Sequence, residues 1–380
     1  MDVTQPMPLL GGLSPATFMR RHWQKKPLVV RQAWPGVQPP IGRAELFDLA
    51  GAEGVESRLL TAFDGGWKLR HGPLARRALP AVKRPNWTLL VQGLDLQWQP
   101  AHQMLQPFRF VPEARLDDLM ISYATDGGGV GPHIDSYDVF LLQVHGQRRW
   151  RIGPVTDRSL VPGLPVRILA NFQPTEEHLL EPGDMLYLPP LWGHDGVAVG
   201  ECMTCSVGFR AATATTLAQE LLHQIADDLE PPEPDATGRA AEAIYRDAAQ
   251  AATATPGRLP ASLRQFAQAA MQRALRDPKA LDRALGVLMT EPKPQVWFEA
   301  GTPLPAGAGV VLDRRSRMAY DDRHVFINGE AFVAAGRDAR LMRALADQRH
   351  LAAAEVARLS DGARALLDDW ADAGWVLADA

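Results

Sequence analysis

Between residues 87 and 210 the sequence predicts short β-rich runs that are separated by Gly/Pro turns, and no helix is expected between them. The runs include NWTLLVQG, LMISYAT, YDVFLLQV, RRWRIG, GDMLYLPP and CMTCSVGFR. Runs with this spacing are typical of antiparallel strands, because a parallel pair needs a long crossover that is usually a helix. This stretch therefore predicts an antiparallel sandwich or barrel, around which the rest of the chain must be arranged.

The segments on either side of this β-rich region have a different character. Residues 1–94 are mixed and are expected to pack on a barrel that spans residues 95–210. Residues 211–292 carry helix-spaced apolar residues in four stretches, which suit either a bundle or an oligomer surface: TTLAQELLHQIADDL, GRAAEAIYRDAAQAATA, SLRQFAQAAMQRAL and KALDRALGVLMT. Residues 293–380 contain HVFINGEAFV, whose Asn-Gly turn predicts a β-hairpin. Three helical stretches follow it, and this order is compatible with a winged helix.

Charge and cysteine content narrow the classes of function. The formal net charge is −4, so direct nucleic-acid binding is not expected, and basic clusters such as RRHWQKK are interpreted as solvated surface. The two cysteines exclude a disulfide scaffold and fit a reducing compartment. No apolar run reaches the roughly 20 residues that a membrane span needs, and MDVTQPMPLLGG lacks the pattern of a signal peptide. We therefore expect a cytoplasmic protein with no membrane partner.

The motif GGGVGPHIDSYDVF at residues 127–140 carries candidate metal ligands. His133 and Asp135 are two positions apart, and on a strand two such side chains lie on the same face. They would supply two ligands of a 2-His-1-carboxylate triad, which leaves positions open on Fe(II) for a cosubstrate and O₂. The second histidine is expected to be His194, in EPGDMLYLPPLWGHDG. The alternative, a surface His-x-Asp pattern without a metal, explains neither the glycine-rich lead-in nor the apolar strand that follows.

A candidate residue for binding the cosubstrate lies on the next strand. In RRWRIG, Arg148 shares a face with Trp150 and Ile152, whereas the arginines at 149 and 151 share the opposite face. An arginine among apolar neighbours is costly to bury without an anion, and its fork-shaped guanidinium matches a carboxylate. Arg148 is thus predicted to bind the distal carboxylate of 2-oxoglutarate. The alternative is a solvated strand end with three surface arginines.

Taken together, these stretches resemble the bacterial JmjC-type (cupin) ribosomal oxygenases, which are iron- and 2-oxoglutarate-dependent protein hydroxylases. The resemblance rests on the order of the segments and on HWQKKPLVVRQ, DDLMISYATDGGGVGPHIDSYDVFLLQVHGQRRWRIG, LEPGDMLYLPPLWGHDG and SVGFRA. It implies an α+β fold in which a double-stranded β-helix (jelly-roll) barrel is followed by a helical dimerisation region and a C-terminal winged-helix-like domain. A homodimer is expected, since a two-fold pair is the commonest assembly.

The resemblance also implies a role for each candidate site residue. Fe(II) would be bound by the three metal-ligand candidates, 2-oxoglutarate by Arg148, and O₂ would be the second cosubstrate. Tyr137 and Met120 would lie near the substrate. In the family the substrate is an arginine side chain of large-subunit ribosomal protein sixteen, hydroxylated at C-3. Two alternatives remain: an oxygenase of another target, such as RNA or a histidyl side chain, and a non-catalytic cupin-like module that binds ribosome precursors.

One position departs from the family pattern. Relatives often carry a hydroxyl residue in the strand before the glycine loop, where this chain has Ala124. If that hydroxyl assists 2-oxoglutarate binding, Tyr123, Thr125 or a water molecule is expected to replace it.

Overall fold

The computed structural model describes residues 1–64, 66–229 and 243–379, and the chain divides into two compact units. The first unit comprises residues 1–211 and 293–297, and the second comprises residues 212–292 and 298–380. A short segment that follows the helical region in the sequence therefore belongs to the first unit. None of the helices in the described part of the chain combines the length and the apolar character of a membrane span.

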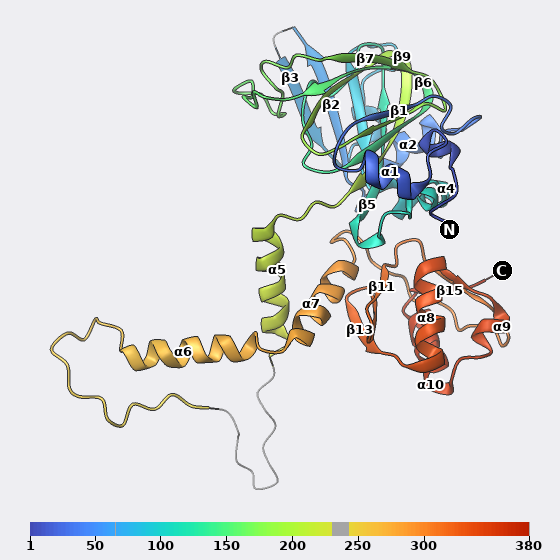
Figure 1. Ribbon diagram of the computed structural model, residues 1–380. Helices are drawn as coiled ribbons and strands as arrows, with labels where there is room; N and C mark the ends of the chain where they lie inside the picture. Colours follow the sequence, from blue (N-terminus) through green and yellow to red (C-terminus); the bar gives the residue numbers. More distant parts are fainter. Residues whose placement is uncertain (65, 230–242, 380) are drawn as a thin grey trace. The chain divides into compact units, whose positions relative to one another are not determined.

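The first unit is built on one antiparallel sheet. Its strands are β1 (Leu28–Val30), β2 (Ser57–Phe63), β3 (Gly66–His71), β4 (Trp87–Val91), β5 (Leu116–Ala124), β6 (Val139–Pro154), β7 (Glu176–Leu180), β8 (Met185–Leu188) and β9 (Trp192–Phe209). They are ordered β1-β8-β6-β9-β5-β4-β2-β3, and β7 also pairs with β6. Figure 1 shows this sheet curled into a barrel. The predicted antiparallel barrel is confirmed, and the first 94 residues contribute four of its strands. The expectation that no helix lies between residues 87 and 210 is wrong, because the short helices α3 (Leu94–Gln97) and α4 (Gln99–Leu105) follow β4.

The long strands β6 and β9 connect the two halves of the barrel. They pair with each other along most of their length, while β6 pairs first with β8 and then with β7. Their register shifts on either side of His145. Gly146 adopts a φ of +60° here, and a Cβ atom at this position would collide with the carbonyl oxygen of Glu201. Glycine at the register shift therefore allows β6 and β9 to bend, so that the same pair of strands takes part in both halves of the barrel.

Apolar side chains fill both faces of this sheet. On one face an aromatic cluster packs under the helices α1 (Pro15–Arg21), α2 (Arg43–Leu49), α3 (Leu94–Gln97) and α4 (Gln99–Leu105). In it Tyr187 lies 4.9 Å from both Phe18 and Phe140, measured between ring centroids. A second buried cluster consists of Val139, Leu141, Trp150, Ile152, Leu180, Leu186 and Leu188. Its members alternate with the first cluster along the strands, as period-two patterning requires.

The second unit begins with helices α5 (Ala214–Asp227), α6 (Ala261–Ala274) and α7 (Pro278–Thr290). These match three of the four predicted stretches. The fourth prediction, over residues 238–254, is wrong where it can be compared: residues 243–254 contain only turns and irregular structure, and residues 238–242 lie outside the described residues. The alanines favour a helix, but Ile244 is 75% exposed and no apolar face is buried. Short helices owe most of their stability to such packing.

The rest of the second unit is a winged helix. Its elements are β10 (Val310–Leu312), β11 (Met318–Tyr320), β12 (His324–Ile327), β13 (Glu330–Val333), α8 (Gly336–Gln348), β14 (His350–Leu351), α9 (Ala353–Val356), α10 (Asp361–Asp372) and β15 (Val376–Ala378). The predicted Asn-Gly hairpin is confirmed: Asn328 and Gly329 connect β12 to β13 with φ values of +49° and +88°. Both central φ values are positive, which this tight turn requires.

Candidate metal centre

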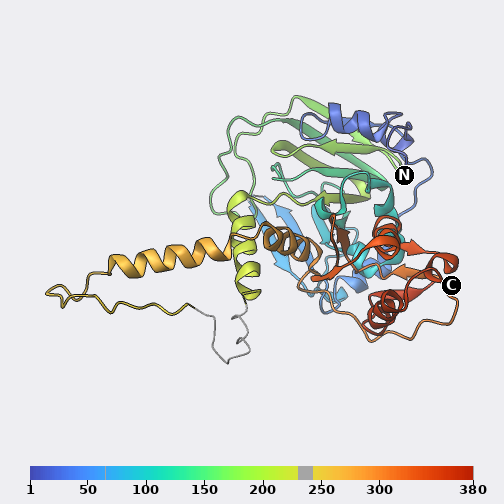
Figure 2. The same cartoon turned by 60° about the horizontal axis from the view of Figure 1, so that its bottom comes forward.

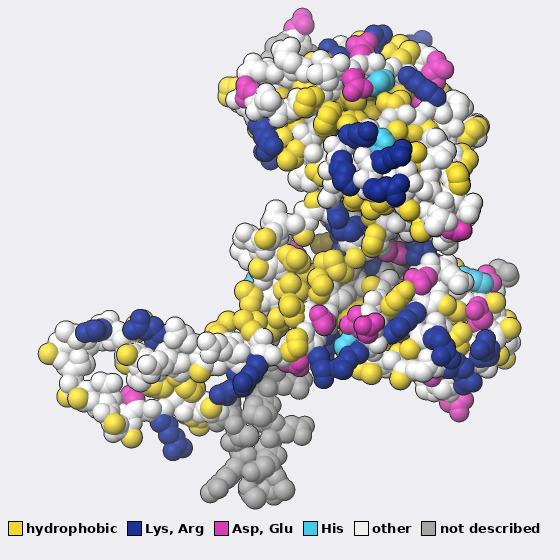
Figure 3. All heavy atoms as spheres, in the orientation of Figure 1, with side chains coloured by type: hydrophobic (Ala, Val, Ile, Leu, Met, Phe, Trp, Pro, Cys, Tyr) yellow, Lys and Arg dark blue, Asp and Glu magenta, His cyan; other side chains and the backbone are white. Residues whose placement is uncertain are grey.

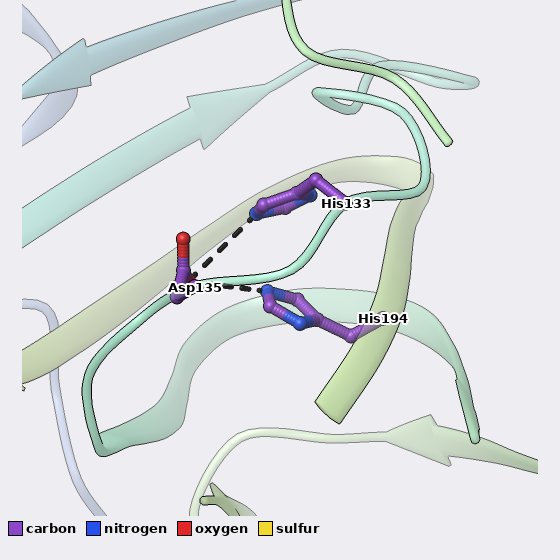
Figure 4. Close-up of side chains that lie close together, drawn as sticks. All are labelled: His133, Asp135 and His194. Atoms are coloured by element: carbon purple, nitrogen blue, oxygen red, sulfur yellow. Dashed lines mark ion pairs between the residues drawn. The ribbon is translucent and has the colours of Figure 1, made fainter. Parts of the chain in front are cut away.

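Three potential metal ligands converge from two segments that are distant in the sequence, the loop before β6 and the start of β9. The ligand atoms of His133, Asp135 and His194 all lie within 4.8 Å of one another. Asp135 Oδ2 is 3.5 Å from His194 Nε2 and 3.9 Å from His133 Nε2. Figure 4 shows both imidazoles turned toward the Asp135 carboxylate. Within the described ranges this is the one group of three or more such side chains that is close enough to hold an ion.

The local backbone differs from the expected strand. His133 and Asp135 lie in an extended segment before β6, and only His133 makes a ladder contact. Its amide donates to the carbonyl of His194 (3.0 Å), and the His194 amide donates back (2.9 Å). Pro132 has no amide hydrogen and Gly131 has a φ of +78°, so a regular strand cannot extend through this segment. The two-residue bridge nevertheless places the two histidines side by side.

The second nitrogen of each imidazole is engaged by the backbone. His133 Nδ1 is 2.8 Å from the carbonyl oxygen of Gly131, and His194 Nδ1 is 3.0 Å from that of Trp192. A carbonyl can only accept, so the neutral ring is held in the tautomer with its proton on Nδ1. Such bonds fix the tautomer and the orientation of metal-bound histidines. Both Nε2 lone pairs are thereby free to face Asp135.

Electrostatics favour the protonation states that bind metals. Burial, together with the nearby His194, lowers the pKa of His133 to about 4. Burial alone would raise the pKa of Asp135, but the nearby His194, with smaller effects of His133 and Tyr137, lowers it overall. His133 is therefore neutral and Asp135 ionised at neutral pH. These are the forms in which the two side chains bind a metal.

Arg148 is buried without a carboxylate partner. It is 5% exposed and shares the interior face with Trp150 and Ile152, as predicted, so the alternative of a solvated strand end is wrong. Its Nη1 donates to Ser122 Oγ (3.0 Å) and Thr204 Oγ1 (3.3 Å), and its buried Nε has no partner. Among the described residues no acidic group is within ion-pair distance of it. Its guanidinium also lies over the Trp150 ring, 5.6 Å from the centroid. A buried guanidinium whose neighbours are hydroxyls and an aromatic ring, with no acid, is a candidate site for an anion.

The two hydroxyl residues beside Arg148, Ser122 and Thr204, were not among the residues predicted from the sequence. Tyr123 and Thr125 were the expected candidates, but Tyr123 packs in the other core against Phe47 (4.9 Å), and Thr125 bonds to the backbone of Trp87. Tyr123 lies on the face of β5 that points away from Arg148, and Thr125 follows the end of this strand. Ser122 shares the face of Met120 and Ala124, so period-two alternation along ISYAT was the signal that could have identified it.

A second polar position lies farther along the same face of β5. Asp118 is 5% exposed, and Gly208 lies opposite it on β9. A Cβ atom at Gly208 would be 3.7 Å from Asp118 Oδ1 and 3.9 Å from Cε2 of Tyr137. Met120 lies between Asp118 and Ser122 on this face, with its sulfur 3.9 Å from a guanidinium nitrogen of Arg58. Tyr137 and Met120 therefore lie near a buried carboxylate, which was also missed in the sequence.

Comparisons with known proteins agree with this architecture. Residues 103–217 match the JmjC domain family, and residues 271–376 match the ROXA-like winged helix. Over 211 residues the chain is 41% identical to the ribosomal protein uL16 3-hydroxylase of Escherichia coli (strain K12). This alignment covers 55% of this chain and 55% of that protein. It is 38% identical over 210 residues to a probable ribosomal oxygenase of Haemophilus influenzae, covering 54% of this chain and 52% of that protein. The sequence alignments thus span about half the length of these curated relatives.

Solved structures match over a longer range. The E. coli ribosomal oxygenase YcfD in complex with cobalt and 2-oxoglutarate has a TM-score of 0.77 and 28% identity, covering 97% of this chain and 99% of that one. The complex of the same protein with cobalt and succinic acid has the same TM-score, with 29% identity. The resemblance inferred from the sequence is confirmed: this chain combines a JmjC domain in a cupin barrel with a ROXA-like winged helix, and it shares this architecture with the E. coli ribosomal oxygenase YcfD.

Proposed function

We propose that this protein is an Fe(II)- and 2-oxoglutarate-dependent oxygenase that hydroxylates an arginine side chain of a large-subunit ribosomal protein at C-3. The observation that carries the proposal is one juxtaposition. A His-Asp-His cluster and a buried, acid-free arginine lie on the interior of one barrel. One barrel thus offers a metal site together with a buried cation for the carboxylate of a cosubstrate.

The donor set suits a ferrous ion. Two imidazole nitrogens and one carboxylate oxygen, from His133, His194 and Asp135, would occupy one side of the metal and leave positions open. Bound iron, with O₂ and 2-oxoglutarate, would supply the oxidising chemistry that no protein side chain can perform. The protein's part is to hold the two rings in one tautomer through the Gly131 and Trp192 carbonyls, and to keep Asp135 ionised.

The cosubstrate would be bound through its distal carboxylate. Arg148 supplies a fork of donors, and Ser122 and Thr204 add hydroxyls within hydrogen-bond distance of that fork. Thr204 is itself oriented by Gln143, whose Oε1 accepts its hydroxyl hydrogen at 2.8 Å. We infer that Ser122 and Thr204 together take over the role of the hydroxyl that relatives carry where this chain has Ala124.

The substrate would approach along β5. Asp118 and Ser122 are four positions apart on one strand face, roughly 13 Å at the usual rise per residue. An arginine side chain would pack its methylenes against Tyr137 and Met120 and place its guanidinium against the Asp118 carboxylate. Asp118 favours a cationic target over a nucleobase or a neutral imidazole, because neither of these would bring a positive charge to its carboxylate.

The helical region would form a homodimer. Figure 3 shows hydrophobic side chains gathered over α5 and α7, and α6 projects away from both helices in Figures 1 and 2. The exposed apolar residues there are Leu222, Met271, Leu275, Leu281 and Leu285, which are between 39% and 55% exposed. An apolar surface of this kind is typical of a protein interface. A substrate that belongs to the ribosome would also place the protein in the cytoplasm.

Incubation with candidate substrates tests the function. The protein is supplied with Fe(II), 2-oxoglutarate and air, together with peptides from large-subunit ribosomal proteins. One arginine peptide should gain the mass of one oxygen atom while an equal amount of succinate forms, and fragmentation should place the oxygen on arginine C-3. A peptide with citrulline at the same position is the matched control. Tight binding of metal and 2-oxoglutarate without oxygen transfer to any ribosomal protein would favour the non-catalytic alternative.

A further inference from the structure

Lys293 reaches the buried carboxylate at the substrate end of β5. It belongs to the short segment Lys293–Trp297, which packs with the first unit although it follows α7 in the sequence. Its Nζ lies 3.0 Å from Asp117 Oδ1 and 3.4 Å from Asp118 Oδ2. The side chain of Lys293 is 22% exposed, so this ion pair is mostly removed from water. A desolvated pair of this kind has a larger energetic effect than a surface pair.

The two oxygens of Asp118 face different partners. Oδ2 accepts the backbone amide of Gly93 at 3.0 Å and pairs with Lys293. Oδ1 is directed toward Gly208 and Tyr137, since a Cβ atom at position 208 would be 3.7 Å from this oxygen and 3.9 Å from the Tyr137 ring. The lysine therefore does not occupy the oxygen that faces the proposed substrate position. It holds the carboxylate from behind.

The surroundings of Asp118 would otherwise oppose its charge. Asp95, 4% exposed on α3, accepts the Leu119 amide at 2.8 Å close by, and Asp117 is the next residue. Burial raises the pKa of Asp118, and Asp117 raises it further, whereas Lys293 and the Gly93 amide lower it. The pKa of Asp95 is raised to about 7, mainly by its burial and further by the nearby Asp118. Of the charged groups facing Asp118, Lys293 is the cation that pairs with it directly.

We propose that Lys293 is a positioning residue for the substrate. Its ammonium keeps Asp118 ionised and oriented, so that Oδ1 can accept hydrogen bonds from a substrate guanidinium. The inference rests on the proposed arginine hydroxylase function. It adds a specificity device that is supplied by a segment outside the barrel strands.

The test compares Lys293→Met with Lys293→Arg in the full-length protein. Lys293→Met should raise KM for the arginine peptide about tenfold, because the carboxylate loses its partner and protonates more readily. The kcat and the affinity for 2-oxoglutarate, measured without peptide, should stay near the wild-type values. The acidic limb of the kcat/KM profile should move to higher pH, since a raised pKa of Asp118 means that ionisation is completed later. Lys293→Arg should restore most of the affinity for the peptide.

A matched control and a double variant separate this role from a structural one. Lys279→Met, at an exposed lysine at the start of α7, should change none of these values. In an Asp118→Asn background, Lys293→Met should have almost no further effect on KM. An unchanged KM and pH profile in Lys293→Met, or an undiminished effect in the Asp118→Asn background, would overturn the inference. Failure of the wild type to hydroxylate any arginine peptide would instead reject the proposed function.

Discussion

The two ends of the inner face of β5 show opposite electrostatic designs. Near Ser122 a buried arginine is surrounded by hydroxyls and has no acidic partner within ion-pair distance among the described residues. Near Asp118 a buried carboxylate has neighbouring acids and one lysine, and one of its oxygens faces Gly208 and Tyr137 rather than the lysine. The charge that is left for a ligand is positive at the first end and negative at the second.

This difference indicates what kind of molecule fits each end. A dicarboxylate suits the Arg148 end and a cationic side chain suits the Asp118 end, because each supplies the charge that the protein withholds. The molecules bound at the two ends would both react at the site of the metal-ligand candidates. An enzyme with two such positions discriminates by charge before any chemistry occurs, and this can be tested one end at a time.

The largest effect is expected at the metal centre, on which both ends depend. His194→Ala should lower peptide hydroxylation by at least about a thousandfold, since a lost ligand leaves the ion without a fixed geometry. Anaerobic titration with Co(II) should show weak or absent binding. His178→Ala is the control, because the His178 ring lies on β7 and pairs with Glu176 of the same strand instead of facing the metal centre. Retained turnover in His194→Ala would refute the ligand assignment.

The Arg148 end should show the next largest effect. Arg148→Met should raise the KM for 2-oxoglutarate about a hundredfold and leave Co(II) binding unchanged, because the fork of donors to the distal carboxylate is lost. Arg149→Met provides a matched control on the opposite face, where the arginine is exposed and pairs with Glu177. Equal effects of the two substitutions, measured by succinate formation, would break the proposed asymmetry between the faces.

A substitution at the Asp118 end should change how strongly the enzyme prefers an arginine peptide over a citrulline peptide. Asp118→Asn should lower kcat/KM for the arginine peptide about tenfold or more and bring it toward the value for the citrulline peptide. The affinity for 2-oxoglutarate should not change. A variant that still prefers arginine to citrulline by the wild-type ratio would show that another group recognises the cation.

The smallest effect is expected at Ser122. Ser122→Ala should raise the KM for 2-oxoglutarate about three- to tenfold, the usual range for one hydrogen bond to a charged group. The change is smaller than at Arg148 because Thr204 also contacts the guanidinium. Ser206→Ala is the control, because Ser206 lies on the same face of β9 as Thr204 but is paired with Met120 instead of Ser122. An effect of Ser206→Ala as large as that of Ser122→Ala would argue against a specific hydroxyl at Arg148.

Much of the fold could be predicted because its patterns are local. Alternating apolar residues marked the strands, and the same alternation placed Arg148 on the interior face with Trp150. His194 could be proposed because a glycine- and proline-bounded strand preceded it. The helix predicted over residues 238–254 failed because propensity alone does not stabilise a helix without a packing partner.

Alternation could place Ser122 on the interior face, but the pairing of the polar residues could not be predicted, because it depends on which strands meet. Ser122 contacts Arg148 only through the barrel geometry that brings β5 beside the bent part of β9 and β6. Asp118 is buried because α3 and the segment beginning at Lys293 cover it. Nothing in the spacing of these residues along the chain indicates that they meet.

One labelling measurement tests the central claim most directly. The protein is incubated with Fe(II), 2-oxoglutarate, the arginine peptide and dioxygen that carries the heavy isotope of oxygen. Our account predicts that one labelled atom enters the arginine residue and one enters succinate, in equal amounts. Succinate formation that is independent of the peptide, with no labelled arginine in any ribosomal protein offered, would contradict it.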